Sequence, residues 1–266
     1  MTRDEKWLLE EKYSGEPCDA FEEDKKRLAS GEPLAYVIGY QPFIGLKIHL
    51  DSHPLIPRTE TEWWTERLLR MWDISCPTSK RNVGHDMSHI SPRPTRLQFL
   101  DLCAGSGAIG CAALAALPDA QVYFGEIDPA HQATILKNIR ENHLDERRAD
   151  IRTGDLFDPF PDMTFDIIAA NPPYIPSART LDTSVADHEP PLALFAGTDG
   201  LDLIRRIAKA LPTRLAPGGI AWVEIDSPTA EAARVLFTGQ GLTAEVLNDQ
   251  YGAPRVIRAE RARASI

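Results

Sequence analysis

Apolar residues follow two different periods along the second half of the chain. Short apolar runs, typical of buried strands, alternate with segments in which apolar residues recur every three or four positions, as on one face of a helix. Strands are predicted at residues 97–102, 121–126, 149–153, 165–170, 220–225, 242–247 and 255–259. Helices are predicted at residues 108–117, 129–142 and 201–215. This alternation is typical of a mostly parallel sheet with helices on both faces, and it therefore predicts an α/β fold.

The chain before residue 97 carries weaker patterns. A helical pattern covers residues 21–28, and the mixture of apolar and turn residues at 33–50 predicts a small β-hairpin. Thr59 and Glu62 have the spacing of a capping box, so we expect a helix from Thr59 to about Met71.

Composition changes at residues 73–96, where prolines, serines and histidines replace any regular apolar period. Such a segment is typical of a flexible insert. We therefore divide the chain into an N-terminal segment with the hairpin, residues 1–58, and a larger domain, residues 59–266, which contains the insert.

Charge and cysteine content exclude several classes of protein. The 266 residues include 29 basic and 39 acidic side chains, a formal net charge of −10. This charge repels a phosphate backbone, so we expect no direct nucleic-acid binding. No apolar run approaches the 18 residues of a membrane-spanning helix, so we expect no membrane partner. The four cysteines form no Cys-x-x-Cys pair and no complete ligand set, so we expect no metal site.

A glycine-rich loop follows the strand at 97–102. Gly105 and Gly107 allow a tight turn and a close approach of the backbone to a ligand. With Gly110 they spell G-x-G-x-x-G, which also fits a dinucleotide site. Glu126, at the end of the next strand, suits the ribose hydroxyls of either NAD or S-adenosylmethionine.

Asp101 decides between these two ligands. An acid at the mouth of the strand would oppose a phosphate at the helix N-terminus, whereas it would attract a cationic sulfonium. We therefore favour the methyl donor over NAD, and a tight turn without any ligand is the third alternative.

The strand at 165–170 ends in the motif Asn171-Pro172-Pro173-Tyr174. Two prolines make this segment rigid and leave two acceptors, the Asn171 side-chain oxygen and the Pro172 carbonyl. Such a pair suits a planar –NH2 group, which becomes a better nucleophile when both of its hydrogens are bound. Tyr174 can stack on the same planar group. The motif therefore predicts methyl transfer to an amide or aromatic amine by positioning and electrostatic stabilisation.

These motifs, together with further segments, resemble the HemK/PrmC-like protein-glutamine methyltransferases, which modify the glutamine of the Gly-Gly-Gln tip in class 1 peptide-chain release factors. The resemblance covers about 200 residues, in segments 31–36, 43–50, 55–62, 101–107, 154–155, 171–174, 188–190, 197–201 and 249–257. It implies a class I S-adenosylmethionine-dependent methyltransferase fold, with a seven-stranded mostly parallel sheet, helices on both faces, and a small N-terminal helix and β-hairpin segment.

The resemblance also implies roles for individual residues. The residues expected to bind S-adenosyl-L-methionine, with Asp101 added from the argument above, are Asp101, Cys103, Ala104, Gly105, Ser106, Gly107, Glu126, Asp155, Leu156 and Asn171. Those expected to bind the substrate glutamine are Asn171, Pro172, Pro173, Tyr174, Arg58 and Glu189, and Asn171, Pro172 and Tyr174 are expected to be catalytic. The sequence departs from the family where Cys103-Ala104 replaces Gly-Thr, Glu126 replaces aspartate, and Leu156 replaces a tryptophan that can cover the adenine.

The family carries an N-terminal helical domain that helps to dock the release factor, and residues 1–58 are expected to be a truncated version of it. We expect the protein to act as a monomer on a release factor. The insert suggests a eukaryotic member and so a mitochondrial location, with the cytoplasm as the alternative. An adenine-amino methyltransferase acting on DNA or RNA, and an inactive methyltransferase-like binding protein, are the alternative functions.

Overall fold

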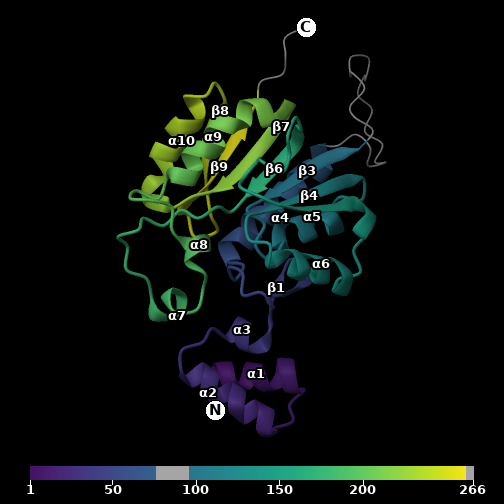
Figure 1. Cartoon of the computed structure of the whole chain (residues 1–266), viewed down its shortest axis with the longest axis vertical. Helices are drawn as coiled ribbons and strands as arrows, with labels where there is room; N and C mark the ends of the chain where they lie inside the picture. Colours follow the sequence, from purple (N-terminus) through teal and green to yellow (C-terminus); the bar gives the residue numbers. More distant parts are fainter. Residues whose placement is uncertain (76–95, 262–266) are drawn as a thin grey trace.

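The computed structural model describes residues 1–75 and 96–261. The predicted insert at 73–96 therefore lies outside the described residues, apart from its two ends. Figure 1 shows three N-terminal helices gathered at one end of the molecule, away from a large sheet with helices on both sides. In the described residues no helix is both long and apolar enough to cross a membrane.

The large sheet confirms the predicted α/β fold. Within the described residues it has seven strands in the order β5-β4-β3-β6-β7-β9-β8. Every neighbouring pair is parallel except those that β9 makes with β7 and β8. The strands are β3 (Leu97–Leu102), β4 (Ala120–Glu126), β5 (Ala149–Thr153), β6 (Phe165–Ala170), β7 (Leu215–Glu224), β8 (Thr243–Asn248) and β9 (Pro254–Glu260).

Helices cover both faces of this sheet. Successive residues of a strand point to opposite faces, so a central strand contributes to two apolar clusters. In β3, Phe99 packs into one apolar cluster, whereas Leu100 and Leu102 pack into another. The first cluster is covered by α4 (Thr59–Ser75), α5 (Ala108–Ala116) and α6 (His131–Glu141), and the second by α9 (Asp202–Arg214) and α10 (Ala230–Thr238). Residues buried on both faces explain why central strands such as β6 appear in the sequence as continuous apolar runs, whereas the edge strands β5 and β8 are less buried.

Apart from short helical turns, three helices of the described chain were not predicted, and one of them, α3 (Leu34–Ile38), lies inside the segment predicted as a hairpin. Helix α10 buries Ala230, Ala233 and Phe237, a helical spacing that the sequence does contain. Helix α1 (Arg3–Tyr13) buries only Leu8 and Leu9, so it carries little apolar signal. Short helical turns complete the described chain at η1 (Glu146–Arg148), α7 (Thr183–Ala186), α8 (Pro191–Leu194) and η2 (Ser227–Thr229).

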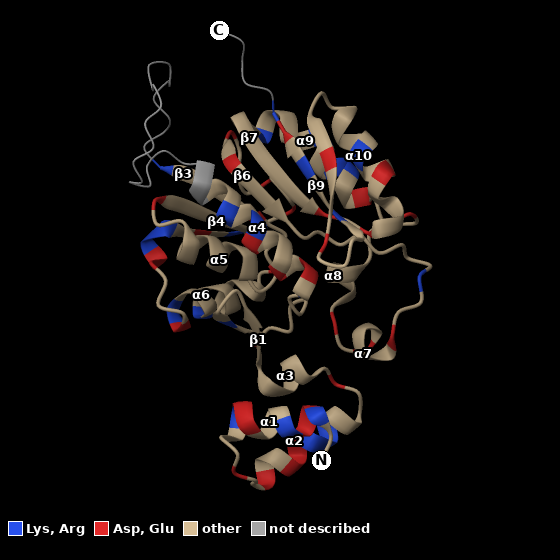
Figure 2. Ribbon diagram, turned by 180° about the vertical axis from the view of Figure 1, so that it is seen from behind, with Lys and Arg blue, Asp and Glu red and all other residues tan. Residues whose placement is uncertain are grey.

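The N-terminal segment contains a small core of its own. Helices α1, α2 (Asp19–Ala29) and α3 (Leu34–Ile38) pack around Leu8, Leu9, Phe21 and Val37. Figure 2 shows acidic and basic residues interspersed on α1 and α2, where Glu22 and Lys25 form one of the ion pairs.

The predicted hairpin is present as β1 (Tyr40–Phe43) and β2 (Leu46–His49), and it joins the N-terminal helices to the sheet domain. Its predicted start at residue 33 is wrong, because residues 34–38 form α3, which packs Val37 into the N-terminal core. The side-chain oxygen of Asn138, on α6, accepts the N–H of His49 at 2.7 Å. The predicted capping box is wrong, because the Glu62 carboxylate accepts the N–H of Ile44 in the hairpin turn at 2.6 Å. Glu62 therefore ties α4 to the hairpin.

Gly110 is required for the packing of α5 against β4. A Cβ at this position would lie 2.2 Å from Cε1 of Phe124, a fully buried ring. We expect Gly110→Ala to lower the free energy of unfolding by about 3 kcal/mol, because overpacking of a buried site costs this order of energy. Urea unfolding measures the change, and the double variant Gly110→Ala/Phe124→Leu should recover part of it. An unchanged midpoint in Gly110→Ala would contradict this packing argument.

Candidate active site

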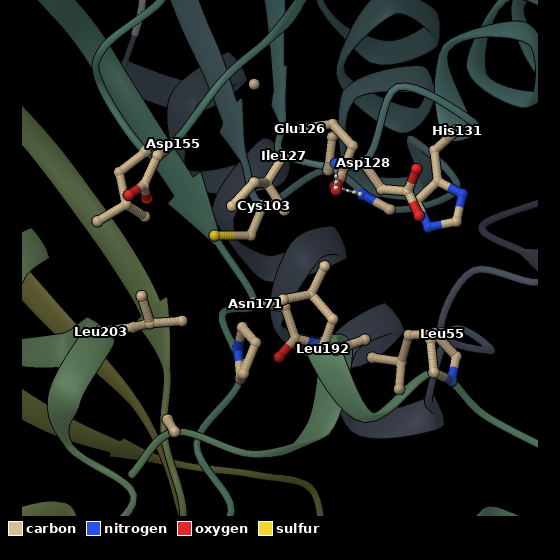
Figure 3. Close-up of a pocket in the computed structure, with 18 of the residues that line it drawn as sticks. Leu55, Cys103, Glu126, Ile127, Asp128, His131, Asp155, Asn171, Leu192 and Leu203 are labelled. Carbon is tan, nitrogen blue, oxygen red and sulfur yellow. Dashed lines mark hydrogen bonds between the residues drawn. The ribbon is translucent and has the colours of Figure 1, made fainter.

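A cavity of about 380 Å³ opens at the C-terminal ends of the parallel strands. Its walls include residues that follow β3, β4, β5 and β6, and it lies beside β3, where the strand order reverses. Ligands of open α/β sheets bind at such a reversal point. Figure 3 shows Glu126, Ile127 and Asp128 on one side of the cavity and Asn171 and Leu192 on the other.

The structure brings most of the predicted site residues to this cavity. Those that line it are Cys103, Ala104, Gly105, Ser106, Glu126, Asp155, Leu156, Asn171 and Pro173. Asp101, Gly107, Pro172, Tyr174, Arg58 and Glu189 are not among its lining residues.

The glycine loop bends sharply between β3 and α5. Cys103, Gly105 and Gly107 all have positive φ, at 61°, 54° and 77°. A Cβ on Gly105 would meet only Pro54 Cβ, at 3.9 Å, so this backbone stays open to the cavity. A Cβ on Gly107 would lie 3.0 Å from Cγ2 of Ile135, so Gly107 allows close packing against α6.

Cys103 faces the cavity but is not a reactive thiol. Burial raises the pKa of the Cys103 thiol, and the nearby carboxylates of Glu126 and Asp101 raise it further. A thiol with a raised pKa is a poor nucleophile. Cys103 is therefore poorly suited to act as a nucleophile.

Glu126 joins two of the loops that form the cavity. Its carboxylate accepts the N–H of Gly105 at 2.7 Å and that of Asp128 at 2.9 Å. A carboxylate has about four acceptor positions, so two remain for a ligand. Both of its protein partners hold it in place at the end of β4, which is the arrangement needed to bind a pair of hydroxyl groups.

Asp101 is placed differently from the sequence prediction. It is fully buried beneath the loop, where one of its oxygens accepts the N–H of Gly110 at 2.8 Å and the other has no partner among the described residues. Burial raises the pKa of Asp101 to about 8, against the opposing effect of the Gly110 N–H, and the charge of Glu126 raises it further. Burial therefore favours the protonated form of Asp101, and its side chain does not line the cavity, so its attraction for a cationic ligand stays a prediction.

One end of the cavity is formed by the loop after β5. Asp155 pairs with Arg206 of α9 at 2.7 Å, and both side chains lie at the rim. Leu156 is nearly buried with a φ of 48°, and it presents an apolar wall beside them. This end can hold a flat apolar group whose edge carries polar atoms.

Asn171 and Pro172 supply two free acceptors at the end of β6. The NH2 group of Asn171 donates to Thr61 Oγ1 at 3.3 Å. Within the described parts of the chain, neither the Asn171 side-chain oxygen nor the Pro172 carbonyl receives a hydrogen bond. Two unpaired acceptors on adjacent residues can bind the two hydrogens of one –NH2 group.

Glu224, at the end of β7, lies behind the Asn-Pro-Pro-Tyr motif. One of its oxygens accepts from Thr61 Oγ1 and from Trp64 Nε1, both at 2.7 Å, and the other accepts from the Tyr174 hydroxyl at 3.0 Å. Burial raises the pKa of Glu224, while these three donors lower it. The carboxylate therefore links α4 to both ends of the motif.

Tyr174 turns its hydroxyl to Glu224, and the following segment is fixed by backbone pairing. The N–H of Ile175 donates to the carbonyl of Leu194, and the N–H of Ala196 donates to the carbonyl of Ile175, both at 2.9 Å. Gly200 is needed at this point, because a Cβ there would lie 2.3 Å from the Tyr174 carbonyl oxygen. Stacking of Tyr174 on a substrate stays a prediction.

Arg58 and Glu189 bind each other instead of facing the cavity. A guanidinium nitrogen of Arg58 donates to the Glu189 carboxylate at 2.5 Å, and the N–H of Ile56 donates to its other oxygen at 3.3 Å. The Glu189 side chain is 1% exposed. The pair holds the segment before α8 against residues 56–58, so its contact with a substrate stays a prediction.

Sequence analysis missed Thr61 and Glu224. Thr61 lay in a predicted helix and in segment 55–62 of the resemblance but was given no role in the site, and nothing local marks it as a cavity residue. Glu224 carried a signal of the same kind as Glu126, because it is an acid inside the apolar run 220–225. Among the described residues, no group of histidine, cysteine, aspartate or glutamate side chains is arranged to hold a metal ion.

A family model and individual relatives both identify this chain as similar to methyltransferases. Residues 87–188 match the family model of the methyltransferase small domain. The chain is 32% identical over 244 residues to the release factor glutamine methyltransferase of Chlamydia trachomatis serovar L2, covering 91% of this chain and 77% of the relative. It is 36% identical to the corresponding protein of Geobacter sulfurreducens, over 87% of this chain and 74% of the relative.

Solved structures agree on the fold. A methyltransferase from Pyrococcus furiosus superimposes with a TM-score of 0.55 at 12% identity, covering 90% of this chain and 98% of that one. The hMettl16 catalytic domain, solved in complex with the MAT2A 3′UTR hairpin 6, gives a TM-score of 0.56 at 17% identity over 84% of this chain and 77% of that one. At these identities the likeness extends to the fold alone.

Proposed function

Because the chain belongs to the family of release factor glutamine methyltransferases, we propose that it methylates the side-chain amide nitrogen of the glutamine in the Gly-Gly-Gln tip of a class 1 release factor. The chain is an S-adenosylmethionine-dependent methyltransferase of the class I fold. The sequence prediction of the family, the fold and the methyl donor is thereby confirmed.

The residues at the cavity fit S-adenosylmethionine. The open backbone at Gly105 gives a cradle that a side chain would fill, and Glu126 keeps acceptor positions for ribose hydroxyls. The apolar wall at Leu156 suits the adenine. The cavity of about 380 Å³ is also within the usual range for small-molecule sites, about 300–1,000 Å³.

Asn171 and Pro172 would carry the chemistry of the transfer. When bound, S-adenosylmethionine supplies a methyl group that its sulfonium makes electrophilic. An amide nitrogen is a poor nucleophile, because its lone pair is delocalised into the carbonyl. Two acceptors on its hydrogens, the Asn171 oxygen and the Pro172 carbonyl, increase the electron density at nitrogen and hold it in one orientation. Held by these two acceptors, the amide nitrogen would take the methyl group from the donor sulfur and would then lose its extra proton to water.

The observation that carries this proposal is the pair of unpaired acceptors at Asn171 and Pro172. Asn171 lines the same cavity as the glycine loop and Glu126. The exposed side chains of Ile127 and Leu192 lie at the same cavity and give its mouth apolar edges. An apolar mouth suits the aliphatic part of a glutamine side chain.

Transfer of a labelled methyl group tests the substrate. The full chain is incubated with labelled S-adenosylmethionine and a recombinant class 1 release factor, in parallel with its Gly-Gly-Gln glutamine-to-alanine variant and a DNA duplex. Label on the wild-type factor alone supports the proposal. Label on DNA alone would instead support an adenine-amino methyltransferase, and label on nothing, despite donor binding, would support an inactive binding protein.

Glu126→Ala is expected to weaken binding of S-adenosylmethionine by about 10- to 100-fold, since a hydrogen bond to a charged group contributes about 1.5–3 kcal/mol. The variant also frees the N–H groups of Gly105 and Asp128 from their shared acceptor. Isothermal titration calorimetry measures the change, with Glu126→Asp as the control that keeps the charge. A dissociation constant within threefold of wild type in Glu126→Ala would show that this carboxylate does not contact the donor.

The release factor is the proposed partner, and the protein is proposed to act as a monomer. Residues 1–58 are proposed to help to dock the partner. The mitochondrial location stays a prediction with the cytoplasm as the alternative, and the bacterial relatives named above give no support to the mitochondrial one.

A further inference from the structure

In each of its hydrogen bonds, the side chain of Glu224 is the acceptor. Trp64 Nε1–H can donate and cannot accept, so the Glu224 oxygen at 2.7 Å must be the acceptor. The same oxygen also binds the Thr61 hydroxyl at 2.7 Å. With Glu224 in its carboxylate form, this oxygen can only accept, so Thr61 donates its single hydrogen to Glu224.

The donation from Thr61 to Glu224 determines the orientation of the Asn171 side-chain amide. The Thr61 hydroxyl has no second hydrogen, so in its 3.3 Å contact with Asn171 the oxygen of Thr61 must accept. The NH2 group of Asn171 must therefore point to Thr61. Because the amide is planar, its oxygen points away from Thr61 and stays free for a ligand. The flipped amide would place two acceptor oxygens against each other.

We propose that Glu224, acting through Thr61, is a positioning residue that fixes the Asn171 amide with its oxygen available to the substrate amide. The inference rests on the proposed function only in its choice of substrate. Glu224 does not line the cavity, so it acts through Thr61 and not by contact with the substrate.

The second oxygen of Glu224 also holds the other end of the Asn-Pro-Pro-Tyr motif. It accepts from the Tyr174 hydroxyl at 3.0 Å, so one carboxylate holds residues 171 and 174 at once. Glu224 is 1% exposed, and an isolated charge in such a place is costly unless it is paired. Hydrogen bonds from three different residues offset the cost of burying this carboxylate, which apolar packing alone would not do.

The test uses three variants of the full chain. Thr61→Val keeps the shape of the side chain and removes the hydroxyl, so the Asn171 amide loses its only orienting contact in the described residues. We expect kcat to fall on the order of 100-fold, because misplacement of about 1 Å can cost that much. Thr61→Ser restores the hydroxyl, and we expect its kcat within about tenfold of wild type.

Glu224→Gln separates orientation from charge. Because Trp64 can only donate, the glutamine oxygen must occupy the position beside it, and Thr61 still donates there. We expect kcat of this variant within about tenfold of wild type. In all three variants the dissociation constant of S-adenosylmethionine should stay within threefold of wild type. A wild-type kcat in Thr61→Val, or a loss in Glu224→Gln as large as that in Thr61→Val, would overturn the proposal.

A second measurement does not depend on activity. The side-chain NH2 signals of Asn171 in a 15N-labelled protein are identified by their absence in Asn171→Ala. We expect them to shift in Thr61→Val and to stay near their wild-type positions in Thr61→Ser and Glu224→Gln. Unchanged signals in Thr61→Val overturn the proposal, even if the wild-type protein methylates no release factor. Failure of the substrate assay alone would overturn the proposed function and leave this inference standing.

Discussion

Asn171→Ala is expected to lower the rate of methyl transfer by about 100- to 1,000-fold, while most of the affinity for S-adenosylmethionine is retained. The variant removes one of the two unpaired acceptors at the end of β6 and leaves the Pro172 carbonyl in place. The loss of one preorganised group that stabilises a transition state costs about 2.7–4 kcal/mol, which corresponds to this range of rates.

Single-turnover rates with the release factor measure the effect, and titration calorimetry measures donor binding. The matched control is Asn248→Ala, which makes the same change at an exposed position on β8. The control should keep the wild-type rate. If a folded Asn171→Ala also kept it, the role given to this amide in the transfer would be wrong.

Asp101→Asn is expected to become more stable relative to the wild-type protein as the pH rises from 4 to 8.5. Burial raises the pKa of Asp101 to about 8 from an ordinary value of 3.8. Between these two values the folded wild-type protein retains a proton that the unfolded chain has lost, so its stability decreases as the pH rises. The slope from this one group is at most about 1.4 kcal/mol per pH unit, and the whole change is on the order of 5 kcal/mol.

Urea unfolding at several pH values gives the difference in free energy of unfolding between the two proteins. Asp199→Asn is the matched control, because its bonds to Arg205, the largest cause, lower the pKa of Asp199 to about 2. That residue contributes stability above the unfolded pKa and loses it only as the pH falls toward 2. Its difference from wild type should therefore stay constant between pH 5 and 8.5. A constant difference in Asp101→Asn would show that Asp101 ionises normally.

Much of the sheet and its site could be predicted because the relevant signals are local. A strand buried on both faces is a continuous apolar run, and such runs placed β3 and β6 at their observed bounds. The edge strand β5 was also predicted at its observed bounds, although it is only partly buried. The acid at the end of β4 and the acceptors at the end of β6 follow from their places in the chain, since parallel strands end at the same edge of a sheet.

Other properties depend on residues that lie far apart in the sequence. Thr61 and Glu224 meet across 163 positions, and Arg58 and Glu189 meet across 131. No period or motif specifies such pairs, because the order of the strands and the packing of α4 decide which side chains face each other. The raised pKa of Asp101 likewise follows from its complete burial, which its place near the end of an apolar strand did not reveal.

The sequence by itself therefore determined where the strands lie along the chain, the family, and the acceptors that the chemistry needs, since each of these is contained in short segments. Only the tertiary structure decided how the Asn171 amide is oriented, which carboxyl groups are buried and so have a raised pKa, and which polar residues bind each other. The physical reason is that hydrogen-bond direction and ionisation depend on the three-dimensional surroundings of each group, and those surroundings come from distant parts of the chain.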